Sequence, residues 1–176
     1  QGRNTEARQS SEDALTEFVD LLNRNPQVVR YHEEKATCML TYGLILRDSE
    51  DVANAAQAFE GARLEFHDLV KLFPKNPVYG RRLATTLLHL ARLHQMQSQT
   101  TEAQTYYDNA IARYKIVIAN NATDLIALDS LAWTYTRKAE LLNQLGMPEP
   151  ASKSYGEAFI VREKLLDNAE HIVNMA

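Results

Sequence analysis

The sequence predicts an all-α protein, an α-solenoid of about seven helices in which antiparallel helix pairs stack one after another. Three observations support this prediction. Apolar residues follow the three- and four-residue steps that place side chains on one face of a helix. No segment alternates between apolar and polar residues for long enough to form a strand. One pattern of small and aromatic residues also recurs at a fixed interval, which is typical of repeat proteins.

The recurring pattern alternates small and aromatic residues at steps of four, three and four. It is clearest within residues 101–118, where it is formed by Ala103, Tyr107, Ala110 and Tyr114. The same set stands 48 residues earlier as Ala55, Phe59, Ala62 and Phe66, and 48 residues later as Ala151, Tyr155, Ala158 and, in the last position, Arg162. A weaker copy near the N-terminus contains Ala7, Ser11, Ala14 and Phe18. Four copies at one spacing predict that the chain grows by repetition of one helix pair.

Turn residues divide the chain into seven predicted helices with short connections. In order, these helices cover residues 4–24, 26–47, 52–72, 77–97, 100–119, 124–145 and 149–168. Asn-Pro pairs at 25–26 and 76–77 predict that Asn caps the second and fourth helices and that Pro takes their first helical position. Polar connections separate the other helices at 48–51, 98–101, 120–123 and 146–149. Because the connections are short, sequential helices are expected to pack antiparallel.

Composition and charge disfavour several functional classes. The formal net charge of −4 gives the chain no general affinity for nucleic acid or for an anionic membrane surface. No apolar run approaches the roughly 18–20 residues of a membrane span. The single cysteine, Cys38, cannot form an internal disulfide and fits a reducing, cytoplasmic compartment. The chain opens with polar residues, without Met and inside a repeat, so we expect it to be a segment of a longer protein.

Each predicted helix pair combines a small residue in its first helix with Ala-x3-aromatic-x2-Ala in its second. The first-helix segments are Met39-x2-Tyr42-Gly43-x2-Leu46, Leu87-x2-Leu90-Ala91-x2-His94 and Tyr135-x2-Lys138-Ala139-x2-Leu142. This combination resembles the tetratricopeptide repeat, whose helix pair carries a similar pattern. The leading Trp of that family is absent, and Gly146 matches the family's glycine between helices whereas Glu50 and Ser98 do not. The resemblance implies a right-handed superhelix of helix pairs.

The period of 48 residues is longer than the family's. It exceeds the usual ~34 residues by about two helical turns on each helix. We expect residues 1–176 to form a single array, with a half repeat at 4–24, full repeats at 26–73, 76–121 and 124–169, and the start of a further repeat at 170–176. Long-helix repeats of this kind are similar to the repeat regions attached to bacterial serine/threonine kinases.

The resemblance implies a non-catalytic protein-interaction module that binds a peptide or partner protein on a concave face lined by the first helix of each repeat. The candidate residues on that face are Arg47, Arg81, Thr85, Leu88, Arg92, Gln95, Trp133, Thr136 and Glu140. Residues 69–101 contain five basic side chains and no acidic one, so the predicted partner is acidic or phosphorylated. Trp133 is a candidate anchor for such a partner.

The same residues allow a purely structural interpretation. At the 48-residue offset Arg81 is flanked by Glu33 and Asp129, and Arg92 by Glu140, so these arginines can form ion pairs between repeats instead. Trp133 can likewise cover an apolar patch. The functional alternatives are therefore a structural or oligomerisation spacer of a larger multidomain protein, and a small-molecule sensor domain. Helix faces left uncapped at both ends predict self-association.

No catalytic motif accompanies the repeat. His89 and His94 are five residues apart and lie about 140° from each other around a helix, so they cannot share a metal ion as an i, i+4 pair can. The chain lacks a glycine-rich phosphate loop, HExxH and a nucleophile elbow. We therefore expect neither enzymatic activity nor a cofactor.

Overall fold

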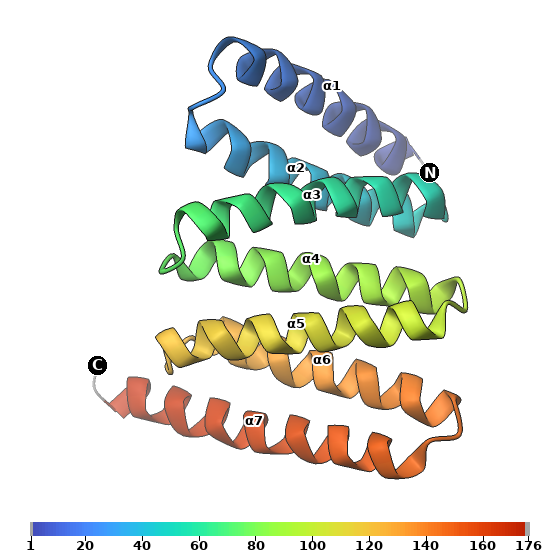
Figure 1. Ribbon diagram of the computed structural model, residues 1–176, viewed down its shortest axis with the longest axis vertical. Helices are drawn as coiled ribbons and strands as arrows, with labels where there is room; N and C mark the ends of the chain where they lie inside the picture. The colour runs from blue at the N-terminus through green and yellow to red at the C-terminus, as the bar shows by residue number, and fades with distance from the viewer. Residues whose placement is uncertain (1, 175–176) are drawn as a thin grey trace. The chain divides into compact units, whose positions relative to one another are not determined.

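The computed structural model describes the backbone of residues 2–174 and the side chains of residues 4–171. Within these residues the regular secondary structure is helical throughout (Figure 1). The helices are α1 Gly2–Arg24, α2 Val29–Asp48, α3 Val52–Leu72, α4 Pro77–Met96, α5 Thr100–Asn120, α6 Leu125–Gln144 and α7 Pro148–Asn174. The predicted all-α class and the number of helices are confirmed.

One of the two predicted Asn-Pro helix starts is correct. At α4 the side chain of Asn76 accepts a hydrogen bond from the amide of Val78 at 3.0 Å, and Pro77 opens the helix. At α2 the prediction is wrong, because the helix begins only at Val29. The amide of Asn25 still donates to Leu21 of α1 at 2.9 Å, so Asn25 closes the preceding helix rather than capping the next one.

The last helix is longer than predicted. We expected it to end at residue 168, but α7 continues to Asn174. Residues 165–172 contain neither proline nor glycine, so nothing in this segment interrupts the helix. The further repeat predicted at 170–176 starts within this continuous helix, and its residues 175–176 lie outside the described part of the chain.

The chain divides into two compact units, Gln1–Tyr79 and Gly80–Ala176. In the first unit, α2 packs against both α1 and α3. Gly43 of α2 lies against the fully buried ring of Phe59, and a Cβ atom at Gly43 would stand 2.6 Å from two ring carbons. The predicted small residue at the helix crossing is therefore required by contact with an aromatic side chain. Across α1 and α2, the hydroxyl of Tyr42 donates to Glu12 at 2.6 Å.

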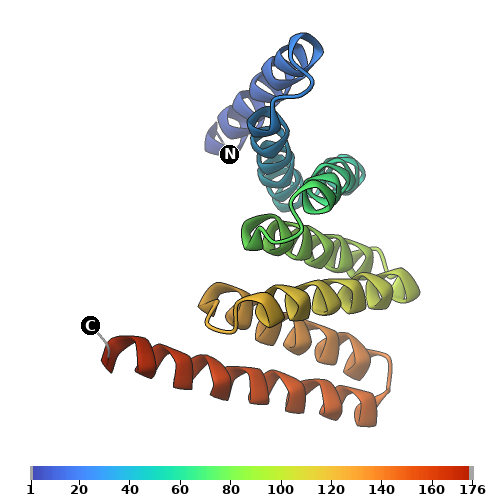
Figure 2. The same cartoon turned by 60° about the vertical axis from the view of Figure 1, so that its left-hand side comes forward.

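In the second unit, α6 packs against α5 and α7, and Figure 2 shows these three helices in sequence from a second side. One core cluster contains residues of all four helices of this unit, α4 to α7. Its buried members are Ala84 of α4; Ile111, Tyr114, Val117 and Ile118 of α5; Ala127, Leu128, Leu131 and Tyr135 of α6; and Ala158 of α7. Tyr107 of α5 and Ala103 are also fully buried, as the recurring pattern predicted.

The 48-residue period also appears in the backbone. Glu50, Ser98 and Gly146 have φ angles of 60°, 59° and 71°, in the left-handed region. Each ends a helix in the same way, because the next residue donates a hydrogen bond of 2.9 Å to the carbonyl five residues back, at Leu46, His94 and Leu142 respectively. The three turns are copies of one structure, although only one of them contains glycine.

Candidate binding surfaces

Trp133 and two arginines meet on the surface formed by α4 and α6. The guanidinium carbon of Arg92 lies 5.2 Å from the centre of the Trp133 ring, and that of Arg137 lies 5.1 Å from it. Arg92 comes from α4 and Arg137 stands one turn after Trp133 on α6. Guanidinium groups at this distance are attracted by the electrons of the indole face. We call Arg92, Trp133, Thr136, Arg137 and Glu140 the Trp133 cluster.

The cluster remains partly open to solvent. Arg137 donates to Glu140 at 2.8 Å, and each of these two side chains is 35% exposed. Thr136 accepts a hydrogen bond of 3.3 Å from Arg162 of α7. Trp133 itself is half-buried. A partly desolvated aromatic ring bordered by more cations than anions can bind an apolar group beside a carboxylate.

Two hydrogen bonds connect the helices that support the cluster. The hydroxyl of Tyr107 donates to Gln95 at 2.8 Å, and Gln95 donates to Gln144 of α6 at 3.0 Å. Burial raises the pKa of Tyr107 to about 12, against the opposing effect of the Arg92 and Arg137 charges. Tyr107 therefore remains a neutral hydrogen-bond donor at physiological pH, and it connects α5 to α4.

Arg81 forms an ion pair between repeats, but not with the predicted acids. Its Nη1 atom lies 2.7 Å from Oδ2 of Asp124, whose side chain is only 3% exposed. The other oxygen of Asp124 accepts a hydrogen bond of 3.0 Å from the amide of Ala127, so Asp124 also caps α6. Glu33, one of the predicted partners, instead accepts a hydrogen bond from Tyr79 at 3.1 Å. Arg81 thus forms an ion pair between repeats, as the structural interpretation predicted, but its partner is Asp124 rather than Glu33 or Asp129.

Several predicted surface residues take part in packing. Leu88 is 4% exposed and lies in the core, so its predicted place on an open face is corrected. Thr85 shares a hydrogen bond of 2.9 Å with Tyr114 of α5. Arg47 belongs to the first unit, where it lies 2.6 Å from Asp48 and is 14% exposed. Of the nine candidates, the structure brings Arg92, Trp133, Thr136 and Glu140 together at one partly exposed cluster.

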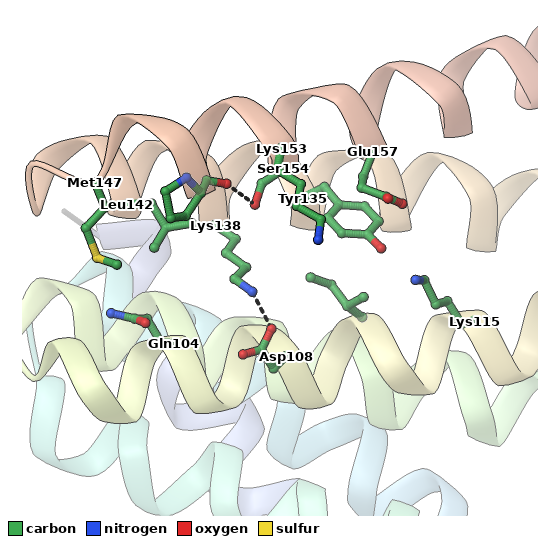
Figure 3. Close-up of a pocket in the computed structure, with 12 residues that line it drawn as sticks. Gln104, Asp108, Lys115, Tyr135, Lys138, Leu142, Met147, Lys153, Ser154 and Glu157 are labelled. Carbon is green, nitrogen blue, oxygen red and sulfur yellow. Dashed lines mark hydrogen bonds and ion pairs between the residues drawn. The ribbon is translucent and has the colours of Figure 1, made fainter.

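A groove lies between α5 and α7, on the side of α6 away from the Trp133 cluster (Figure 3). We call it the α5–α7 groove; its volume is about 510 Å³. Tyr135 and Lys138 of α6 line it, and they lie roughly 140–160° around the helix from Trp133. Three lysines and two acids, Lys115, Lys138, Lys153, Asp108 and Glu157, stand along its walls. The basic segment predicted from the sequence covers residues 69–101, so the lysines of this groove were not among the predicted binding residues.

The family model described as tetratricopeptide repeat matches residues 83–119, which cover most of α4 and all but the end of α5. Residues 83–119 are therefore similar to a tetratricopeptide repeat. Repeats of this kind usually mediate protein–protein interactions through surfaces built by stacked helix pairs. A search of curated protein sequences finds no match to this chain.

The fold is similar to that of a solved structure. The crystal structure of BtubC (BKLC) from P. vanneervenii superposes with a TM-score of 0.66 at 17% identity, covering 92% of this chain and 58% of BtubC. The present chain thus spans a little over half the length of that protein. The chain of the DHF58 filament aligns at 17% identity and a TM-score of 0.49, covering 96% and 84% of the two chains. MamA aligns at 15% identity and a TM-score of 0.28, covering 92% and 94%. Of these three structures, BtubC is the one whose TM-score is high enough to indicate a shared fold.

Two kinds of structural feature are absent from the described residues. No helix there combines the length and the apolar content needed to cross a membrane. No group of three or more His, Cys, Asp or Glu side chains in that part of the chain is arranged to hold a metal ion.

Two important residues of the surface formed by α4 and α6 were absent from the sequence-based candidates. Arg137 was missed because only the predicted groove stripe was considered, although its i, i+4 spacing from Trp133 indicates contact on one helix face. Asp124 was missed as the partner of Arg81, although an Asp directly before an apolar run is a typical N-cap. Both signals were present in the sequence.

Proposed function

We propose that this protein is an interaction module that binds an acidic segment of a partner protein on the surface formed by α4 and α6, with the Trp133 cluster as its centre. The observation that carries the proposal is the pair of guanidinium groups within about 5 Å of a half-buried Trp ring. The cluster contains two arginines and one glutamate, and Arg162 adjoins it through Thr136. In a chain of net charge −4, this local positive charge favours an acidic partner.

Trp and Arg are the side chains that most often dominate binding free energy at protein interfaces. A half-buried indole offers apolar area that is already held in place, so little side-chain freedom is lost on binding. The arginines offer planar donors for carboxylates. The surface therefore suits a peptide in which an acidic residue stands next to an apolar or aromatic one. We also propose a cytoplasmic location, because the single Cys38 leaves no internal disulfide to form.

Binding is tested with fluorescein-labelled hexaglutamate and hexalysine peptides, whose affinity is measured by fluorescence anisotropy. Trp133 is the chain's one tryptophan, so its emission reports contact at the cluster. We expect hexaglutamate to bind, to change the Trp133 emission and to lose affinity with added salt. Arg92→Gln and Arg137→Gln should each weaken binding about fivefold, as expected for the loss of about 1 kcal/mol.

The matched control is Arg82→Gln, an exposed arginine on α4 outside the cluster, which should bind like the wild type. Equal affinity for hexalysine and hexaglutamate, or unchanged binding by both cluster variants, would contradict the proposal. Circular dichroism of each variant verifies that the helices remain folded.

A second candidate function is a structural spacer of a larger multidomain protein, such as one carrying the serine/threonine kinase domain suggested by the repeat length. The ion pair between Arg81 and the nearly buried Asp124 favours it, because this contact fixes α4 against α6 without any ligand. A small-molecule sensor is less well supported, since the α5–α7 groove is open on one side and bordered by lysines rather than closed and apolar.

We also propose self-association through the outer face of α7. Tyr155, Phe159 and Leu166 are 39%, 62% and 63% exposed, whereas Tyr107, Ile111 and Ile118 at the same positions of α5 are at most 8% exposed. Sedimentation velocity at rising protein concentration should show a larger species, and Phe159→Ser should reduce it. A monomer at every concentration would oppose this part of the proposal.

A further inference from the structure

The α5–α7 groove is lined by two residues that replace a stacked pair of rings in the preceding repeat. Between α4 and α5, His94 and Tyr106 stack with ring centres 5.1 Å apart and planes inclined by 10°. Forty-eight residues later the corresponding residues are Leu142 and Ser154, and both line the groove. The groove has a volume of about 510 Å³, which is within the range of known ligand sites.

The groove has an apolar end and a charged end. Figure 3 shows Leu142 and Met147 at one end and Lys115 and Glu157 at the other, with Lys138 between them. The floor is well packed, since Leu142 is 4% exposed and Tyr135 is 6% exposed. Ser154 is also buried, and its hydroxyl is occupied by a hydrogen bond of 3.0 Å to the carbonyl of Pro150. An apolar group can therefore rest at the first end without displacing a buried polar contact.

The charges along the walls leave one cation in excess. Lys138 of α6 and Asp108 of α5 form an ion pair at 2.5 Å. Lys115, which lies over the ring of Tyr135 at 5.6 Å, interacts electrostatically with Glu157 across the groove. Lys153 of α7 is exposed, and among the side chains that the structure describes no carboxylate lies within ion-pair distance of it. Three lysines and two acids thus favour a ligand with a single negative charge.

We propose that the α5–α7 groove binds a peptide segment of a partner protein in which an apolar side chain stands beside a single carboxylate. The apolar side chain occupies the end formed by Leu142 and Met147, and the carboxylate pairs with Lys153. The groove is open to solvent along one side, so a peptide can enter and leave it as a continuous chain, whereas an acyl chain would remain partly in water. This site is independent of the Trp133 cluster, which lies on the opposite face of α6.

The test measures anisotropy of three fluorescein-labelled hexapeptides, Gly-Ser-Leu-Glu-Ser-Gly and its Leu-Gln and Ala-Glu counterparts. We expect the Leu-Glu peptide to bind at least fivefold more tightly than either counterpart. Lys153→Gln should weaken its binding at least fivefold, while Lys164→Gln, at another exposed lysine of α7, should leave it unchanged. Ser154→Tyr introduces the residue that the preceding repeat holds at this position, places a ring in the groove and should weaken binding at least fivefold.

Trp133 emission separates this site from the proposed interaction surface. Binding in the groove should leave that emission unchanged, and Arg92→Gln should not alter the affinity for the Leu-Glu peptide. The inference is overturned if Lys153→Gln and Ser154→Tyr, shown by circular dichroism to be folded, bind like the wild type. It is also overturned if binding shifts the Trp133 emission, or if octanoate binds in the groove and the peptide does not. Failure of hexaglutamate to bind at the Trp133 cluster would leave the groove inference standing.

Discussion

Glu50 and Ser98 hold a backbone conformation that costs free energy for any residue with a Cβ atom. Their φ angles of 60° and 59° place Cβ close to the following carbonyl oxygen, at a cost of about 1 kcal/mol. The conformation persists because each turn closes with a hydrogen bond to the last turn of the preceding helix. Gly146 adopts the same conformation at φ 71° without that cost.

Glycine at these two positions should stabilise the protein. Glycine relieves about 1 kcal/mol of strain in the folded state. This exceeds the roughly 0.5 kcal/mol by which the greater chain entropy of glycine stabilises the unfolded state. We therefore expect Glu50→Gly and Ser98→Gly each to raise the free energy of unfolding by about 0.5 kcal/mol, and Gly146→Ala to lower it by about 0.5 kcal/mol. Urea unfolding measures all three. Glu17→Gly, at an exposed position inside α1, is the control and should be destabilising. A loss of stability in Glu50→Gly would contradict the account.

His32 is held between two acceptors in the first unit. Its Nδ1 atom lies 2.9 Å from Glu65 and its Nε2 atom 2.8 Å from the carbonyl oxygen of Pro26, while Lys35 lies 2.8 Å from Glu65. Only the protonated imidazole can donate to both acceptors. Burial by itself would lower the pKa of His32, but the hydrogen bonds to Pro26 and Glu65 outweigh it and raise this pKa. Burial likewise opposes ionisation of Glu65, but Lys35 and His32 lower its pKa on balance.

These two shifts define a pH window for stability. Because the pKa of His32 is raised on folding, its contribution is complete below the ordinary histidine pKa of about 6.5 and is lost as pH rises through the folded value. The contribution of Glu65 is present above its unfolded pKa and is lost as pH falls through its folded value. The stability difference between wild type and His32→Gln should therefore be largest near about pH 5.5–6 and should shrink towards pH 8. Thermal unfolding across this range measures it, with His67→Gln as control. A difference that is constant with pH would refute the assignment.

At the scale of single elements, α6 depends on the residue that caps its N-terminus. Asp124 precedes Leu125, caps the amide of Ala127 and receives the charge of Arg81 from α4. One nearly buried side chain thus satisfies a free helix amide and connects two repeats. The ion pair requires an acid at the helix start, whereas the exposed Asp129 further along α6 was the predicted partner.

The two functions of Asp124 can be separated by substitution. Asp124→Asn keeps an oxygen acceptor for the cap but loses the attraction of Arg81, so we expect a loss of about 1 kcal/mol. Asp124→Ala removes the cap as well and leaves Arg81 without this carboxylate, for a loss of about 2–3 kcal/mol. Urea unfolding gives both values. Asp129→Asn is the matched control and should change stability by less than about 0.5 kcal/mol. Equal effects of Asp124→Asn and Asp129→Asn would mean that the ion pair contributes nothing.

At the scale of the whole molecule, the chain comprises two compact units of a repeat fold. In repeat proteins, stability is close to a sum of terms for each repeat and for contacts between neighbouring repeats. A local defect therefore weakens the helices around it more than distant ones. Positions 43 and 139 are suited to a comparison, because each is the small residue of its repeat and each belongs to a different unit.

Hydrogen exchange should show this locality. Gly43→Ala places a Cβ atom 2.6 Å from ring carbons of the buried Phe59, so we expect a net loss of about 1–3 kcal/mol despite the better helix propensity of alanine. Amide exchange should accelerate in α1–α3 far more than in α6 and α7. Ala139→Gly should produce the reverse distribution, with a loss of about 1 kcal/mol from helix propensity. Equal acceleration across all seven described helices would indicate a single cooperative unit instead.

The sequence by itself determined the class of this protein and its period. Helical spacing of apolar residues encodes each helix locally, and the small–aromatic pattern at a 48-residue interval identifies the faces that pack, as the buried Ala55, Phe59, Ala103 and Tyr107 confirm. Helix ends were less predictable. The backbone amide of Asn25 is hydrogen-bonded to the preceding helix. Glu50 and Ser98 adopt a left-handed conformation that glycine usually occupies.

Only the tertiary structure decided which side chains meet across helices. Arg92 reaches Trp133, Arg81 reaches Asp124 rather than Asp129, and the α5–α7 groove opens beside Ser154. These contacts depend on the distances and angles between helices far apart in the chain. A shift of a few ångströms changes which acid an arginine reaches, and residue spacing within one helix carries no record of that shift.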